Sequence, residues 1–175
     1  DFNGADQEGI GLYQVTQKNG ERWSAARAYI EPHRSRKNLS VITGAAATRV
    51  LFQGRRARGV EYQRKGQVAQ AKARREVIVS CGALQSPQLL MLSGIGDANQ
   101  LKKFGIEVVH DLPSVGRNLQ DHVDFLFAYR SSSRDLFGIS LGGIARLWRE
   151  IGRYRREGSG MLTSNVAEAG GFLKT

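Results

Sequence analysis

The residues with the clearest chemical potential form a strand-like run, a glycine turn and a helix-like segment in succession. The apolar β-branched run Val77-Ile78-Val79 is followed by Gly82, and the segment continues to Gly96. A glycine after a buried strand lets a ligand approach the backbone, and a helix N-terminus offers free N–H groups to an anion. Nucleotide sites are often built this way. The local pattern alone favours a plainer interpretation, in which Gly82 only permits a tight connection.

Three Gly-x-Gly triplets lack the full spacing of a dinucleotide-binding loop. They lie at Gly9–Gly11, Gly94–Gly96 and Gly158–Gly160. None has the third glycine of the G-x-G-x-x-G fingerprint, which allows a helix to pack closely on its strand. The triplets therefore identify no cofactor by themselves.

Cysteine and histidine are too few for a metal cluster or an internal disulfide. The single cysteine, Cys81, follows the apolar run and is expected to be a small core residue, because no neighbouring His or Lys would activate it. One cysteine also fits a reducing compartment. The three histidines, His33, His110 and His122, are expected to play ordinary hydrogen-bonding or exposed roles.

Composition and charge limit the class of protein. The 175 residues are 41% hydrophobic and 24% charged, which argues against disorder and predicts one domain or two small ones. A formal net charge of +10 favours nucleic acid, an anionic membrane surface or an anionic cofactor as partner. No stretch approaches the roughly 20 apolar residues of a membrane span.

Alternating helical and strand-like patterns predict the elements that position these residues. Ser24 caps a short helix over 25–30 that Pro32 ends, after a loop-like first segment. Val77–Val79 shows no polar alternation, so it is expected to be a central strand buried on both faces. Further strands are predicted at 39–42, 48–53, 60–63, 106–109 and 125–129, with a hairpin loop at 54–57.

Helix punctuation is clearest in the second half of the chain. Ser86 as N-cap and Pro87 at the first helical position predict a helix that runs to Leu92. Asp97 caps a second helix over 98–104, and a basic amphipathic helix is predicted over 144–156. The chain is thus of the α/β class, with mixed helices and strands.

Four blocks along the chain resemble one family. The segment from Gly82 to Gly96 resembles the second signature of the glucose–methanol–choline (GMC) oxidoreductases, flavoproteins that oxidise alcohols. The blocks Leu112 to His122 and Ser24 to Tyr29 are similar to its neighbouring blocks. Glu168 to Phe172 resembles a block of the choline-dehydrogenase and alkanol-dehydrogenase branch. The resemblance covers nearly all of the chain, in the family's order.

The resemblance implies parts of two domains. Residues 38–122 would be part of a Rossmann-like FAD-binding domain with a β-meander. Residues 1–37, with the connecting helix, and 123–175 would be parts of a substrate-binding domain. Family members carry a G-x-G-x-x-G loop near their N-terminus and, near their C-terminus, a His with a second His or Asn beside the flavin ring, whereas this chain has neither. We therefore expect an internal segment of a longer enzyme.

Site residues carry over only where the motifs match. The resemblance implies that Val50 contributes backbone contacts to the adenine of FAD, that Gly82 and Ala83 lie near its ADP portion, and that Asn118 also contacts the cofactor. Glu168 could face a cationic alcohol such as choline, although a surface or capping role is the more ordinary interpretation. No catalytic residue and no metal site are predicted within the chain.

The reaction implied for the parent enzyme is oxidation of choline or another primary alcohol to the aldehyde, with hydride transfer to the flavin. The base is expected outside the chain, so the isolated segment is expected to be inactive. The choline-like and alkanol-like blocks favour a dehydrogenase with a quinone or other electron acceptor. We expect a cytoplasmic protein with possible peripheral contact to the inner membrane.

A rival hypothesis is a stand-alone basic module that binds nucleic acid or an anionic surface without catalysis. It rests on the arginines and lysines between Arg55 and Arg75. Phe52 and Tyr62 fall on the predicted buried side rather than on a stacking platform, so a solvated charged face is favoured and nucleic acid is not. The basic helix over 144–156 could instead contact a membrane or a protein surface.

Overall fold

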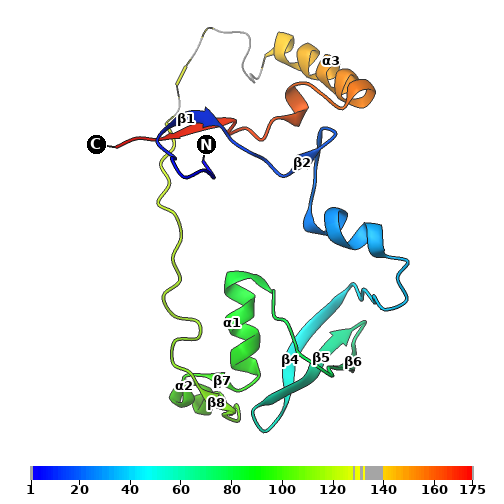
Figure 1. The fold of residues 1–175 in the computed structure, drawn as a ribbon, viewed down its shortest axis with the longest axis vertical. Helices are drawn as coiled ribbons and strands as arrows, with labels where there is room; N and C mark the ends of the chain where they lie inside the picture. The colour runs from blue at the N-terminus through cyan, green and yellow to red at the C-terminus, as the bar shows by residue number, and fades with distance from the viewer. Residues whose placement is uncertain (1, 128, 131, 133–139, 175) are drawn as a thin grey trace. The chain divides into compact units, whose positions relative to one another are not determined.

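The computed structural model describes residues 2–127, 129, 130, 132 and 140–174. Its backbone contacts divide the chain into two compact units. Unit 1 comprises residues 1–40 and 127–175, and unit 2 comprises residues 41–126. Both units contain helices and strands (Figure 1). The mixed α/β class expected from the sequence is confirmed, whereas the domain boundaries expected from it stay predictions.

A three-stranded antiparallel meander, in the order β4-β5-β6, forms one half of unit 2. Its strands are β4 (Ala45–Gln53), β5 (Arg56–Arg64) and β6 (Gln67–Lys72). The first turn contains Gly54, with φ of 58°, because a two-residue hairpin needs a positive φ there. The predicted hairpin is confirmed, but its turn consists of Gly54 and Arg55 alone, because Arg56 and Ala57, predicted to lie in the loop, pair with β4.

Two helices and a small parallel pair form the other half of unit 2. They are α1 (Gly82–Leu92), β7 (Ile95–Gly96), α2 (Ala98–Lys103) and β8 (His110–Asp111), and β7 pairs with β8. The Asp97 carboxylate caps α2 as predicted, since it accepts the N–H groups of Asn99 at 2.9 Å and Gln100 at 3.1 Å. The strand predicted at 106–109 is wrong: strand pairing begins only at His110.

Helix α1 begins earlier than Ser86 and Pro87 predict. Its first residue is Gly82, so Pro87 lies inside the helix, and Ser86 does not cap it. The Ser86 hydroxyl instead accepts the Cys81 N–H at 3.0 Å. The hydroxyl therefore binds the turn before α1 and does not act as the N-cap of a helix that begins at Pro87.

The predicted central strand Val77–Val79 is wrong for the described chain. Residues 76–80 have no strand pairing, and the Ile78 side chain is 77% exposed. An extended run cannot satisfy its backbone N–H and C=O groups without neighbouring strands, and none lies beside it in the described part of the chain. Cys81 is consequently exposed rather than buried. The strand predicted at 39–42 is absent for the same reason.

Unit 1 contains two small antiparallel pairs. Strand β1 (Gly9–Leu12) pairs with β9 (Ala169–Phe172), and β2 (Gln17–Lys18) pairs with β3 (Glu21–Arg22). The predicted helix after Ser24 is present as a π-helical turn (Ala26–Ile30) followed by a 3-10 turn (Glu31–His33). Pro32 lies within the second turn, where its missing N–H costs nothing.

Helix α3 (Leu141–Glu157) is the longest element of the described chain and confirms the predicted basic helix. The Ser140 hydroxyl accepts the Gly143 N–H at 3.0 Å, and Gly158 ends the helix with φ of 61°. A 3-10 turn (Met161–Thr163) follows. The strand predicted at 125–129 is not formed by its described residues, whose aromatic side chains are exposed, and residue 128 lies outside them.

Gly94 allows the closest backbone approach beside α1. Its φ is 85°, and a Cβ there would lie 2.3 Å from the Glu107 carbonyl oxygen. We expect Gly94→Ala to lower the free energy of unfolding of the full-length protein by more than about 2 kcal/mol, because the clash adds to the strain of a positive φ. Urea unfolding would measure this.

Gly105→Ala is the matched control for that substitution. Gly105 has φ of 69°, but a Cβ there meets no atom within 4 Å, so only the conformational strain of about 1 kcal/mol applies. Equal losses in the two variants would show that the approach of Glu107 to Gly94 is not what requires the glycine.

Candidate functional site

The centre of the candidate site is a chain of two hydrogen bonds that joins β4 to α1. The Val50 N–H donates to the Ser93 hydroxyl at 2.8 Å, and that hydroxyl donates to the Leu89 carbonyl at 2.5 Å. All three residues are buried, at 5%, 7% and 6% exposure for Val50, Ser93 and Leu89. The edge of β4 that faces away from β5 is therefore fixed to the last turn of α1.

A cavity of about 810 Å³ lies beside this edge. Its walls come from β4, from the turn after α1 and from the segment after α2, and include Val50, Ser93, Gly94 and Val109. Such a volume is within the usual range of small-molecule sites. The cavity is therefore large enough for a nucleotide base with its sugar.

Positive charge predominates around the cavity. Arg49 and Arg55 line it, with Glu107 as the one acidic residue of the lining. Arg49 also donates two hydrogen bonds to the Glu61 carboxylate, from Nε at 3.1 Å and Nη2 at 3.0 Å. These bonds lower the pKa of Glu61, so Glu61 stays ionised and holds the Arg49 side chain in place. Because Glu61 holds Arg49, Arg55 is the arginine of the lining that is left to face an anionic group of a ligand.

Gly82 and Ala83 lie at the opposite end of α1. An eleven-residue helix is about 16 Å long, so these residues do not share the cavity with Val50. Gly82 has φ of 85°, and a Cβ there would meet no atom within 4 Å. Pro87 has no N–H, so the Ala83 carbonyl lacks the donor that an α-helix normally supplies four residues on. The turn thus offers open space and an acceptor.

Asn118 lies in an extended polar segment after Gly116. It is exposed and has φ of 57°, a conformation that asparagine tolerates better than most residues. The neighbouring Arg117 donates from Nη2 to Asp97 Oδ2 at 2.8 Å, which ties this segment to the start of α2. Asn118 does not line the cavity beside Val50.

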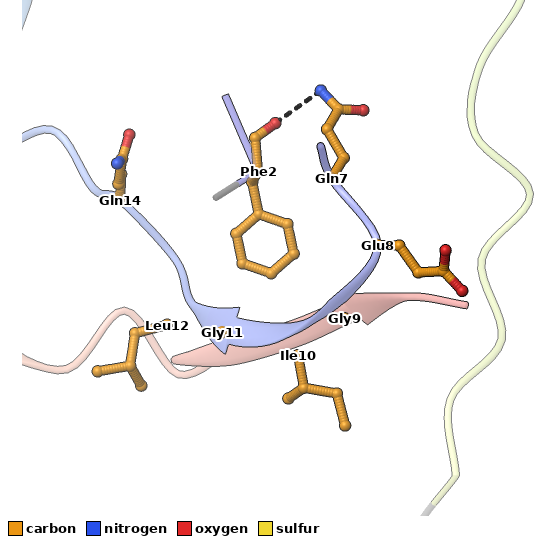
Figure 2. Close-up of a pocket in the computed structure, with 8 residues that line it drawn as sticks. All are labelled: Phe2, Gln7, Glu8, Gly9, Ile10, Gly11, Leu12 and Gln14. Atoms are coloured by element: carbon orange, nitrogen blue, oxygen red, sulfur yellow. Dashed lines mark hydrogen bonds between the residues drawn. The ribbon is translucent and has the colours of Figure 1, made fainter. Parts of the chain in front are cut away.

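Glu168 lies in unit 1, and its carbonyl accepts the Tyr13 N–H at 2.9 Å next to the β1–β9 pair. Its side chain is exposed. A cavity of about 310 Å³ lies near β1 and is lined by eight residues between Phe2 and Gln14 (Figure 2). Phe2 lies over the glycine face of β1, while Ile10 and Leu12 point to the other face. Glu168 does not line this cavity.

The described residues fit parts of an FAD molecule rather than all of it. The cavity has the size for an adenosine portion, and the Ala83 carbonyl is an acceptor for a hydrogen bond from a hydroxyl group. The Val50 N–H, however, is already bonded to Ser93, so only the Val50 carbonyl, which faces the same strand edge, is left for a purine amino group. The chain also has no G-x-G-x-x-G loop for a pyrophosphate.

Sequence reasoning missed Ser93. A serine at the end of a helix next to Gly94 suggests a cap rather than a buried bridge, and nothing local indicates that β4 lies 43 residues away in sequence but within hydrogen-bond distance. His33, His110 and His122 are exposed, and no group of three His, Cys, Asp or Glu side chains among the described residues could hold a metal ion.

The comparisons with solved structures define the class of protein. The chain matches an FAD-dependent oxidoreductase from Chaetomium thermophilum with a TM-score of 0.76 and 25% identity, over 91% of this chain and 28% of that one. It matches pyridoxine 4-oxidase from Mesorbium loti with a TM-score of 0.61 and 36% identity, over 66% of this chain and 23% of that one. The fold is that of part of a flavin-dependent oxidoreductase.

The family follows from a family model described as GMC oxidoreductase, which matches residues 1–124. The chain belongs to the GMC oxidoreductase family, as its motifs predict. It is 52% identical to "Alcohol dehydrogenase [acceptor]" of Pseudomonas putida, over 100% of this chain and 32% of that protein. It is 45% identical to "Choline dehydrogenase, mitochondrial" of Homo sapiens, over 100% and 29%. The chain thus spans about a third of the length of these relatives.

We expect Ser93→Ala to lower the free energy of unfolding of the full-length protein by about 1–3 kcal/mol, because the buried Val50 N–H loses its acceptor. Chemical denaturation with both wild type and variant would measure it. Ser86→Ala removes a hydroxyl that also accepts a backbone N–H, but at an exposed position. A loss in Ser86→Ala as large as in Ser93→Ala would contradict the central role of the Val50–Ser93 bond.

Proposed function

We propose that the full-length protein is an FAD-dependent oxidoreductase that oxidises the CH–OH group of a small primary alcohol, such as choline or an alkanol, to the aldehyde. The observation that carries this proposal is the 52% identity to an alcohol dehydrogenase along the whole chain. The rival basic module has no comparable support, since among its arginines Arg55 lines the cavity and Arg58 donates to the Gln53 side-chain oxygen at 3.0 Å.

The residues of this chain bind and orient the cofactor rather than perform the proton transfer. Val50 presents its carbonyl beside the cavity, Arg55 supplies positive charge, and Gly82 and Ala83 leave room and an acceptor at the start of α1. Asn118 is assigned to the same cofactor by its motif. FAD supplies the hydride acceptor when it is bound. The general base belongs to another part of the protein, so the isolated chain is inactive.

The proposals for the substrate and for the electron acceptor rest on the similar proteins more than on the geometry. Glu168 would attract a cationic alcohol if it faced the flavin, and a neutral alkanol would not require it. A quinone or a dye would accept the electrons. We place the protein in the cytoplasm with peripheral contact to the inner membrane. None of the helices in the described chain is long and apolar enough to cross a membrane.

Flavin content and alcohol oxidation of the full-length protein test the proposal directly. The purified protein should show a flavin absorption spectrum, and addition of a primary alcohol or choline should bleach it under anaerobic conditions. Dye reduction should then follow the same order of alcohols. A well-folded, colourless protein that takes up no added FAD would refute the proposal.

The turn before α1 gives a more specific test. Gly82→Leu should weaken FAD binding to the full-length apoprotein by at least about tenfold, because a side chain would fill the open space by the cofactor. Gly66→Leu is matched, since Gly66 has φ of 78° and equally open surroundings but lies in the β5–β6 turn. If both variants bind FAD alike by fluorescence titration, Gly82 does not contact the cofactor.

A further inference from the structure

Helix α3 packs against the rest of unit 1 through a polar side. Glu150 is the buried residue of the helix, 8% exposed, and its carboxylate accepts the Met161 N–H at 3.1 Å. Tyr154, one turn further on, is half-buried. The 3-10 turn over Met161–Thr163 contacts the helix, and the bond from the Met161 N–H shows that it does so on the Glu150 side. The unit therefore covers Glu150 and partly Ile151 and Tyr154, and it leaves the apolar side chains of the first two turns of α3 exposed.

The uncovered face of α3 carries four large apolar side chains. Leu141, Ile144, Leu147 and Trp148 are 89%, 50%, 42% and 70% exposed. Leu141, Ile144 and Trp148 follow the i, i+3, i+7 spacing, so they form one stripe along the first two turns. An exposed apolar stripe of this kind marks an interaction surface.

Arginines flank this stripe. The helix contains five arginines and two glutamates, and Arg149, Arg153, Arg155 and Arg156 are exposed. One glutamate, Glu150, is buried, and the other, Glu157, already accepts a hydrogen bond from Arg153 at 3.2 Å. The exposed surface of α3 therefore combines apolar side chains with a strong excess of positive charge.

We propose that this face of α3 lies on an anionic membrane surface. An anionic lipid interface offers an apolar layer beneath a layer of negative headgroups. The apolar side chains of α3 match the first layer and its arginines match the second, and neither match requires carboxylates in a defined geometry. Trp148 suits the boundary between the layers, because an indole has an apolar body and one N–H donor. At 17 residues the helix would lie about 25 Å along the surface.

The inference deepens the proposed function, because an enzyme at the membrane surface would lie next to a lipid-soluble electron acceptor. Only this consequence rests on the proposed function, whereas membrane binding by α3 does not. The competing occupant is a segment of the full-length protein outside these residues. A protein surface would have to supply both an apolar groove and several acidic groups, whereas an anionic lipid interface supplies both at once.

Co-sedimentation of the full-length protein with vesicles tests the inference. Binding is expected to vesicles of phosphatidylcholine mixed with phosphatidylglycerol, and little to phosphatidylcholine alone. Ile144→Ser with Trp148→Ser should weaken binding at least about tenfold, because two apolar side chains no longer leave water. Arg149→Gln with Arg156→Gln should weaken it several-fold and reduce its dependence on salt.

Matched controls remove the same groups elsewhere. Val68→Ser removes an apolar side chain that is 64% exposed on β6, and Arg56→Gln with Arg74→Gln removes two exposed charges from unit 2. These variants should bind vesicles as the wild type does. The inference fails if the wild type ignores anionic vesicles, or if the controls lose as much binding as the α3 variants.

A second readout separates membrane contact from internal packing and from catalysis. Loss of vesicle binding by the Ile144 and Trp148 variant with an unchanged melting temperature supports the membrane. A lowered melting temperature with unchanged binding shows that another segment of the protein covers α3, and overturns the inference. Flavin content and dye-linked alcohol oxidation, measured without vesicles, report on the proposed function independently.

Discussion

The hydrogen bond from the Val50 N–H to the buried Ser93 hydroxyl holds unit 2 together. Helix α1 packs on β4, and this bond lies within that buried contact. The bond fixes the last turn of α1 against β4, and this alignment sets two features at once. It forms the cavity beside Val50, and it directs the other end of α1, with Gly82, about 16 Å away. An extended dinucleotide could contact both ends.

The described residues bury little apolar surface by themselves. Val50, Leu89 and Leu101 are the buried hydrophobic residues among them, whereas Ile78, Leu84 and Phe104 are each at least 70% exposed. A core this small supplies little of the free energy that folding needs, because that energy scales with the apolar area removed from water. Local hydrogen bonds, such as the Asp97 cap, therefore define the elements more than packing does.

Local signals in the sequence correctly predicted the elements that local interactions stabilise. The β4–β5 hairpin, the Asp97 cap and α3 each satisfy their own backbone groups within a short segment, so turn residues and capping residues identify them. The run Val77–Val79 could not be assigned correctly in the same way, since a fully apolar strand depends on neighbours that sequence periodicity does not reveal. The hydrogen bond between Val50 and Ser93 could not be predicted from the sequence either, because no local pattern specifies contacts between residues so far apart in the chain.

Exposed apolar residues therefore fall into two physical kinds. In the described chain, the Val77–Val79 run lacks strand partners for its backbone N–H and C=O groups and apolar contacts for the exposed Ile78. Only neighbouring strands could supply both. Helix α3 has every interior backbone group paired and both ends capped, so only its side chains lack a partner. A lipid interface can supply apolar contact and negative charge but few backbone hydrogen-bond partners. It can therefore complete α3 but not the 77–79 run, which is why the membrane is assigned to the helix.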